Sequence, residues 1–394
     1  MVPLTVPVDR RSYLALLLAS TTAGCSLWGG DGVATETATQ PRNPVDDLVA
    51  GHVVAVGADL VTTTIPTDGT ETPVQDALDA ISESGGRVYL PPGRVEERGP
   101  VRPHPNTGIY GFGMNVSVLH IISPNTDGIR FDRQDRANRV QLDGFELRAP
   151  GPNTASGVAI HFLDNGAEPV TDPADFYVGR LYCWAWTNSV YRVDQGVGPF
   201  QCRHDFLRMD DCDAGDANAL VEWRSSYGPA NVFGSIVAYP TAEWSGADSS
   251  LLYQRGGELA IGDVTAGGSA GRLVDTKSGR LHVGRLHYEP EDQQATPGSI
   301  ARIGAGGATR FDDVVHDTGR VEYVYDLAEG AGNALLLGPP GGRATVGENV
   351  VNVSGSLDGE RRSFYFGPTD DVDVTATSNT GNLRVLGEAG EGLG

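Results

Sequence analysis

Two groups of polar and aromatic side chains recur at alternate positions along short apolar segments of the chain. Alternate residues of a β-strand point to the same face, so the members of each group would share one surface. The first group consists of Arg180, Tyr182, Trp184, Phe206, Arg208 and Asp210, with Asp211 just beyond it and Tyr239 on the next segment. The second group consists of Arg285, His287, Glu289, Asp313 and Asp317. Aromatic rings can stack on the apolar face of a sugar ring, while carboxylates and arginines can bind its polar groups or transfer protons.

These residue types suit two reactions on a sugar polymer, and their spacing leaves both open. Hydrolysis uses one protonated and one ionised carboxyl group, about 5 Å apart in retaining enzymes and about 6.5–9.5 Å apart in inverting ones. β-Elimination needs a base and a group that neutralises the substrate carboxylate, a role suited to Arg208 beside Asp210 and Asp211. The candidate catalytic residues are Arg208, Asp210, Asp211, His287, Glu289 and Asp313. The candidate substrate-binding residues are Arg180, Tyr182, Trp184, Tyr239 and Arg285.

Both groups lie on copies of a repeated six-residue pattern. Its first, third and sixth residues are apolar, its fourth is Asp or Gly, and its second and fifth can be any residue. Its centres, which lie 36, 26, 29, 28, 22 and 28 residues apart, are Asp143, Gly179, Asp205, Gly234, Gly262, Gly284 and Asp312. Repeats of this length are typical of stacked units that share one core. Strand periodicity directs positions −3, −1, +2 and +4 from each centre inward, and positions +1, +3 and +5 outward. The pattern therefore predicts one interior column formed by Leu142, Val178, Phe233, Ile261, Val283 and Phe311.

The repeat also predicts which outward residues are neighbours. A second short strand is predicted after each copy, for example at residues 190–193 and 220–223. Neighbouring strands lie about 4.8 Å apart, so equivalent positions of successive copies should adjoin. This spacing pairs Glu289 with Asp317 and Arg285 with Asp313. His204 falls at an inward position, where we expect a hydrogen-bonded core histidine.

A helix is predicted just before the repeats begin. Thr72 can be its N-cap, Pro73 suits the first helical position, and Gln75 would complete a capping box. Its apolar face would consist of Val74, Ala77, Leu78 and Ile81, and Gly85 and Gly86 would end it. A strand at residues 87–90, a Pro-Pro-Gly turn at residues 91–93 and a Gly-rich segment at residues 108–113 follow.

This succession, with the turn at residues 68–72, resembles the amino-terminal signature of the pectate-lyase-like superfamily. The resemblance implies a right-handed single-stranded parallel β-helix, an all-β solenoid with a short N-terminal capping helix. The superfamily includes lyases, glycosidases, epimerases and viral tail spikes, its ligand groove follows an outward face, and its lyases often use Arg or Lys as the base. Asp210 and Asp211 resemble the paired aspartates of polygalacturonases. The Gly-His-Gly and Arg-x-Lys elements of that family are absent from this sequence.

Composition narrows the classes of partner and environment. Asp and Glu number 51 against 29 Lys and Arg, which gives a net charge of −22, and Lys277 is the single lysine. An acidic, lysine-poor surface is typical of proteins adapted to high salt, where carboxylates stay hydrated and their repulsion is screened. A nucleic-acid partner is disfavoured because such proteins need a basic face. The 53 glycines and 24 prolines disfavour a mainly helical fold.

The first residues are typical of an export signal. Arg10 and Arg11 precede an apolar stretch at residues 13–23, as in a twin-arginine signal, and residues 22–25 resemble a lipobox that ends at Cys25. The predicted organisation is a signal at residues 1–25, a flexible tether at 26–50, a parallel β-helix domain at 51–385 and a disordered tail at 386–394. Lipidation of Cys25 would anchor the protein outside the cell, on the outer face of the membrane. No apolar run is long enough for a transmembrane helix.

Cysteine spacing and acidic segments assign no metal site. Cys183, Cys202 and Cys212 allow at most one disulfide, and they lack the spacing of a zinc site. Residues 210–216 are dense in carboxylates and could bind Ca²⁺, although they lack the spacing of an EF-hand. Two functions remain open: an exported polysaccharide lyase or glycoside hydrolase acting on an acidic or complex glycan, and a non-catalytic carbohydrate-binding or adhesion protein of the cell surface. The sequence leaves the oligomeric state open.

Overall fold

The computed structural model describes residues 47–48 and 51–327, with gaps at 133–137, 152–153, 167–172, 216, 218, 240–248, 268–270, 290–298, 305–306, 317–319 and 322. Beyond residue 327 it describes short strand segments. The described residues are mostly β, with strands in parallel sheets and one helix of about two turns, α3 (Pro73–Ala80). No helix in the described part of the chain is long and apolar enough to cross a membrane.

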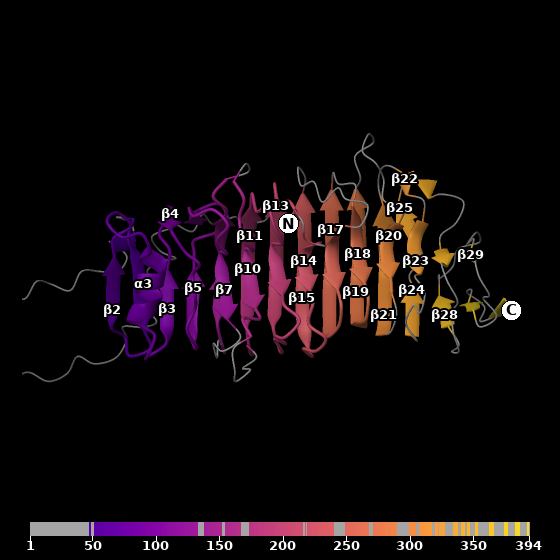
Figure 1. Cartoon of the computed structure of the whole chain (residues 1–394), viewed down its shortest axis with the longest axis horizontal. Coiled ribbons are helices and arrows are strands. Elements are labelled where there is room, and N and C mark those ends of the chain that lie inside the picture. The colour runs from indigo at the N-terminus through magenta and orange to yellow at the C-terminus, as the bar shows by residue number, and fades with distance from the viewer. Residues whose placement is uncertain are drawn as a thin grey trace, which may run out of the picture.

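The larger sheet, called the first sheet, runs the length of the molecule (Figure 1). Its strands before the repeats are β1 (Val53–Gly57), β2 (Thr62–Ile65), β3 (Gly86–Tyr89), β4 (Gly93–Glu97), β5 (Thr107–Tyr110) and β6 (Ser117–Ile121). Its strands in the repeats are β8 (Gln141–Asp143), β9 (Phe145–Arg148), β11 (Tyr177–Trp184), β13 (Arg203–Asp210), β15 (Asn231–Tyr239), β17 (Glu258–Gly267), β19 (Gly279–Glu289), β21 (Gly307–His316), β24 (Ala334–Leu337) and β25 (Pro340–Gly342). Strand β1 pairs antiparallel with β2 and β3, and the later pairings in this sheet are parallel.

The second sheet is parallel throughout its described pairings. Its strands are β7 (Ile129–Asp132), β10 (Ile160–Leu163), β12 (Tyr191–Val193), β14 (Ala219–Trp223), β16 (Ser250–Gln254), β18 (Arg272–Thr276), β20 (Ser299–Ile303), β23 (Tyr323–Leu327), β27 (Val351–Val353) and β29 (Val374–Ala376). From β10 to β21 the chain alternates between the two sheets, so successive turns stack along the long axis (Figure 1). Small pairings join β22 (Arg320–Val321) to β26 (Thr345–Val346), and β28 (Arg362–Tyr365) to β30 (Leu383–Leu386) and β31 (Gly392–Leu393).

The first sheet bends at the centre of each repeat. The pairing of β11 with β13 passes from Val178–His204 to Arg180–Phe206 and skips the central residues Gly179 and Asp205. Strands β8 and β9 pair with the two halves of β11 separately, so the sheet has one part before the bend and one part after it. A Cβ atom at Gly179 would collide with the Asp143 carboxyl group, which is why glycine suits that bend.

The predicted interior column is confirmed by the strand register. Leu142, Val178, Phe233, Ile261, Val283 and Phe311 are buried and follow one another strand by strand, with His204 between Val178 and Phe233. The His204 ring stacks on Phe233 with centroids 4.0 Å apart and planes 7° apart. Burial lowers the pKa of His204 to about 3, so this histidine is a neutral part of the core.

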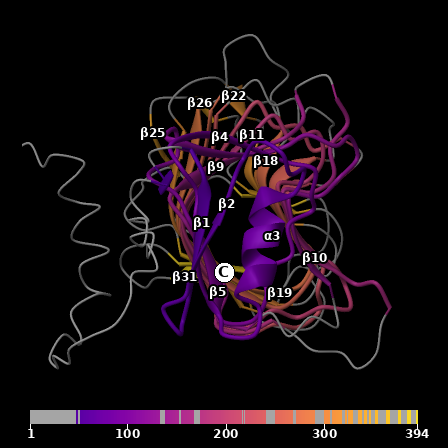
Figure 2. The same cartoon turned by 90° about the vertical axis from the view of Figure 1, so that its left-hand side faces the viewer.

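Helix α3 covers the N-terminal end of the stack (Figure 2) and buries the predicted apolar face. The predicted capping box is wrong, because the Thr72 side chain makes no capping hydrogen bond. Its hydroxyl donates to Asp76 at 3.0 Å instead, while Glu97 Oε2 of β4 accepts the Val74 backbone N–H at 2.8 Å. A long-range carboxyl group thus replaces the local cap. The helix also ends at Ala80, before the predicted glycines.

The three body cysteines do not pair with one another. Cys183, Cys202 and Cys212 are all buried free thiols. Burial raises the pKa of Cys202 and of Cys212 to about 12, so neither is a reactive thiolate at neutral pH. These cysteines act as small core side chains.

Candidate functional site

The part of the first sheet after the bend carries two rows of outward residues, which we call the site face. One row reads His120, Arg148, Trp184, Asp210 and Tyr239, and the other reads Val118, Glu146, Tyr182, Arg208, Val237, Thr265, His287 and Val315. Each member is the direct register partner of the next. The prediction that Trp184, Arg208 and Asp210 share one outer face on consecutive turns is therefore confirmed.

Arg208 lies at the centre of the site face, bound to a carboxylate on its own strand. Its Nη2 lies 2.7 Å from Asp210 Oδ2, and its Nε lies 3.2 Å from each Asp210 oxygen. The guanidinium carbon lies 5.5 Å from the centre of the Tyr182 ring and 5.9 Å from that of Tyr239. The hydrogen bond to Asp210 raises the pKa of Arg208, so the arginine stays charged. Burial, together with the Asp210 charge, raises the pKa of Tyr182.

Trp184 is half-buried rather than an open platform. Its Nε1 donates a hydrogen bond to Asp211 Oδ2 at 2.8 Å, and the Arg148 guanidinium carbon lies 4.7 Å from the centre of its ring. Arg148 and Asp211 therefore hold the indole in one orientation. Asp211, expected to be catalytic, serves in this geometry as a hydrogen-bond acceptor for Trp184.

Glu146 is a site residue that the sequence interpretation missed. It is buried beside Tyr182, and its Oε1 accepts a hydrogen bond from Arg148 Nε at 2.6 Å. Burial and the Asp210 charge raise the pKa of Glu146, while Arg148 opposes that rise. A signal for it existed, because Glu146 and Arg148 occupy positions +3 and +5 after Asp143, equivalent to Tyr182 and Trp184 after Gly179.

The second predicted group lies further along the same sheet. His287 Nε2 lies 3.1 Å from Glu289 Oε1, and Arg285 is the register partner of Asp313, as predicted. Asp317, the expected neighbour of Glu289, lies outside the described residues. His287 lies three strands away from Arg208, a separation of about 14 Å. The two groups therefore lie along one face and do not converge at one point.

Arg180 lies at the margin of the site face. Its side chain is exposed, and its backbone N–H donates to Asp143 Oδ1 at 2.8 Å. Its register partner on β13 is Phe206, two positions before Arg208. Arg180 can reach a ligand from the bend, but it is not a member of the Arg208–Asp210 cluster.

The Asp211 and Asp213 carboxylates, which follow β13, already accept hydrogen bonds from other groups of the protein. Asp211 accepts from Trp184, and Asp213 Oδ1 accepts the Gly215 N–H at 2.8 Å. Asp216 lies outside the described residues. No group of three or more His, Cys, Asp or Glu side chains in the described ranges has a metal-binding arrangement.

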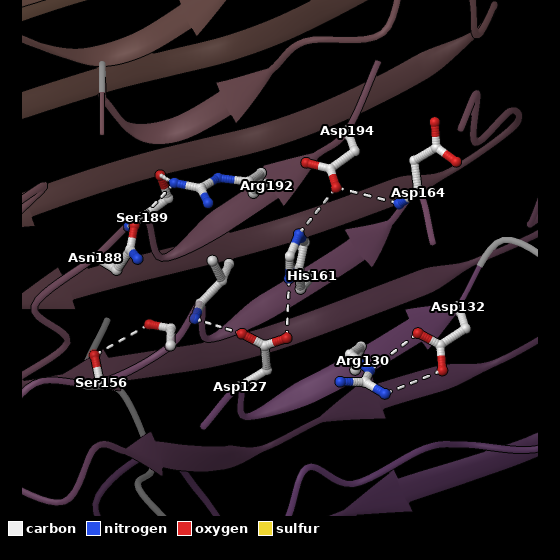
Figure 3. A network of polar contacts seen from close by, with 12 residues as sticks. Asp127, Arg130, Asp132, Ser156, His161, Asp164, Asn188, Ser189, Arg192 and Asp194 are labelled. Atoms are coloured by element: carbon white, nitrogen blue, oxygen red, sulfur yellow. Dashed lines mark hydrogen bonds and ion pairs between the residues drawn. The ribbon is translucent and has the colours of Figure 1, made fainter. Parts of the chain in front are cut away.

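A polar network on the second sheet was also missed. It centres on His161 and joins Asp127 and Asp194 from the neighbouring turns (Figure 3). The two aspartates lie in connecting segments outside the strands, so the spacing of residues along the strands does not predict that they meet.

Comparison of the chain with family models, with curated proteins and with solved structures finds no match in any of the three. The site face carries a buried carboxyl group, an arginine–carboxylate pair and three aromatic rings, a set that suits binding and acid-assisted cleavage of a sugar polymer.

Proposed function

We propose that the protein is a right-handed single-stranded parallel β-helix of the pectate-lyase-like kind that binds an acidic or complex polysaccharide along the site face and cleaves it. The alternation of strands between two parallel sheets, the continuous interior column and the terminal helix support this fold. Tyr182, Trp184 and Tyr239 supply the ring surfaces that a sugar needs.

One juxtaposition carries the catalytic part of the proposal. Buried Glu146, with its raised pKa, lies on the same face as Asp210, which forms an ion pair with Arg208. The two carboxyl-bearing residues are two strand steps apart, about 10 Å between strands, and two positions apart along them, and their side chains can approach more closely. A carboxyl group whose pKa is raised by burial, on the same face as a second carboxylate, is the arrangement that glycoside hydrolysis requires.

In this mechanism Glu146 gives its proton to the departing glycosidic oxygen, and Asp210 takes a proton from the attacking water. The strand separation suits the wider carboxyl spacing of inverting enzymes better than the narrow spacing of retaining ones. β-Elimination with Arg208 as the base is disfavoured, because Asp210 raises the pKa of that guanidinium. Hydrolysis is therefore the preferred reaction class.

A panel of neutral and acidic polysaccharides, incubated with the purified protein in molar salt, tests this assignment. Hydrolysis releases reducing ends without the ultraviolet absorbance of unsaturated uronates. We expect Glu146→Gln and Asp210→Asn each to lower turnover by about 10²–10⁴-fold. The matched control is Glu258→Gln, an exposed carboxylate that pairs with Arg280 before the bend. Unsaturated products, or full activity in both site variants, would refute the hydrolytic mechanism.

A non-catalytic carbohydrate-binding or adhesion protein is the second candidate. One observation favours it, since the polar groups of the site face are already paired as Glu146–Arg148, Asp210–Arg208 and Glu289–His287. Such a protein would bind a glycan without releasing product, and all site variants would change affinity alone.

The proposed location is the outer face of the cell membrane. The twin-arginine motif and the lipobox support export and attachment at Cys25. A glycan partner outside the cell and a high-salt surrounding fit the acidic composition.

A further inference from the structure

His161 lies between carboxylates that come from the turns on either side of its own. It belongs to β10 and is 7% exposed. Its Nδ1 lies 2.9 Å from Asp127 Oδ2, and its Nε2 lies 3.4 Å from Asp194 Oδ2 (Figure 3). Asp127 precedes β7, and Asp194 directly follows β12. One imidazole thus contacts the preceding and the following turn at once.

The same carboxylates hold the backbone at both ends of β10. Asp127 Oδ1 accepts the Val158 N–H at 2.8 Å, just before the strand. Asp194 Oδ2 accepts the Asp164 N–H at 3.1 Å, just after it. Each aspartate therefore contacts both the imidazole and the backbone at one end of β10, Asp127 at its start and Asp194 at its end.

The other charged groups around His161 have partners of their own. Its register neighbours are Arg130 on β7 and Arg192 on β12. Arg130 pairs with Asp132 at 3.0 Å, and Arg192 pairs with Glu222 at 2.6 Å. Asp164 Oδ1, in turn, accepts the Gly166 N–H at 3.0 Å. His161 is thus the ring that both Asp127 and Asp194 face.

A neutral imidazole has one N–H and one lone pair, so it cannot donate to two carboxylates. We propose that protonated His161 is a pH-sensitive clamp that joins three successive turns of the second sheet and opens on its Asp194 side when the proton leaves. That side opens first because the Nε2 contact is the longer of the two. Loss of the proton would turn the Nε2–carboxylate contact from attraction into repulsion of lone pairs.

The direction of the titration agrees with this geometry. Burial alone would lower the pKa of His161, but its hydrogen bond to Asp127, its ion pair with Asp194 and the charges of both aspartates raise that pKa above its usual 6.5. The pKa of each aspartate is in turn lowered, with burial opposed by the bond to His161. The contribution of His161 is therefore complete below pH 6.5 and is lost as pH rises through its raised folded-state pKa.

Nuclear magnetic resonance of the intact protein tests the clamp, with the His161 ring signal identified by its loss in His161→Gln. We expect that signal to titrate above pH 6.5. We expect Asp194→Asn to lower the midpoint by about one pH unit, a roughly tenfold weaker proton affinity. Amide exchange, corrected for its intrinsic pH dependence, should accelerate at Asp164 more than at Val158 as pH passes the midpoint. The matched control is His282→Gln, which removes a histidine–aspartate contact on the first sheet and should leave the His161 midpoint unchanged.

Three results would overturn the proposal. The first is a His161 midpoint at or below 6.5, and the second is a midpoint that Asp194→Asn leaves in place. The third is equal acceleration of exchange at Asp164 and Val158. If His161→Gln does not fold, sequential resonance assignment of the intact protein identifies the His161 signal, and Asp194→Asn still tests whether its midpoint moves.

Discussion

Arg208 and Asp210 form an ion pair along one strand, with Nη2 and Oδ2 2.7 Å apart, and the rings of Tyr182 and Tyr239 lie close to the guanidinium. The two residues are two positions apart, so both side chains project from the same face of β13. The strands on either side contribute the rings. The pair is therefore already oriented before any ligand arrives.

Substitutions at this pair and at Trp184 should separate binding from turnover. We expect Trp184→Ala mainly to weaken ligand binding, by about tenfold or more, because it removes a ring surface. Arg208→Ala and Asp210→Asn should mainly lower kcat if the protein is an enzyme. Steady-state kinetics and direct binding provide the two readouts, and Arg203→Ala, from an exposed pair before the bend, is the control. Wild-type behaviour in all three variants would move the site to His287, Glu289 and Asp313.

Glu97 should make stability fall as pH rises. Burial raises its pKa to about 8, from 4.5, so the folded protein favours the neutral acid. This contribution is complete below pH 4.5 and is lost as pH rises through about 8, a change on the order of a few kcal/mol. Denaturant unfolding between about pH 4 and 9 should show that Glu97→Gln removes this loss. Glu96→Gln, an exposed neighbour on β4, should leave it unchanged. Parallel pH profiles of Glu97→Gln and the wild type would contradict the account.

Ile261 tests the interior column. Its side chain is buried between Phe233 and Val283, so Ile261→Asp places a charge in a dry core and should prevent folding. Ile261→Val keeps the column apolar and should cost about 1 kcal/mol. Circular dichroism and thermal unfolding measure both effects. A folded, cooperative Ile261→Asp protein would show that the column contributes little to stability.

Salt should stabilise the folded protein. The excess of 51 acidic over 29 basic residues leaves a net charge of −22, whose mutual repulsion is stronger in dilute buffer. Salt also weakens exposed ion pairs such as Arg98–Glu71, but each is worth little. Calorimetry in rising potassium chloride should therefore show a rising Tm. An unchanged or falling Tm would mean that repulsion among the carboxylates does not govern the salt dependence of stability.

Export is tested in cells rather than on the purified domain. Replacement of Arg10 and Arg11 by lysines should block secretion, because the twin-arginine pair is the proposed signal. Cys25→Ala should release the mature protein into the medium, since it removes the proposed lipid attachment point. Fractionation and immunoblotting follow both variants. Secretion of the double-lysine variant, or membrane retention of Cys25→Ala, would reject the corresponding signal.

The sequence by itself determined the stacking of the repeats. A strand places alternate side chains on opposite faces, so a one-residue error would have exchanged inside and outside. The residues predicted at column positions, such as Val178 and Ile261, are all buried, and Tyr182 and Trp184 point outward beside Arg208 and Asp210. Local periodicity sufficed because each turn repeats the geometry of the last. The same rule would have revealed Glu146, had it been applied to the copy centred on Asp143.

Only the tertiary structure decided which distant polar groups meet. Glu97 takes over the cap predicted for Thr72 because β4 passes the first turn of α3, a contact across 23 residues. His161 meets Asp127 and Asp194 because the turns stack, although 34 residues separate it from Asp127. Both contacts depend on how segments without a repeating pattern cross the ends of strands. Hydrogen bonding and burial in the assembled stack select those partners, and strand periodicity carries no information about them.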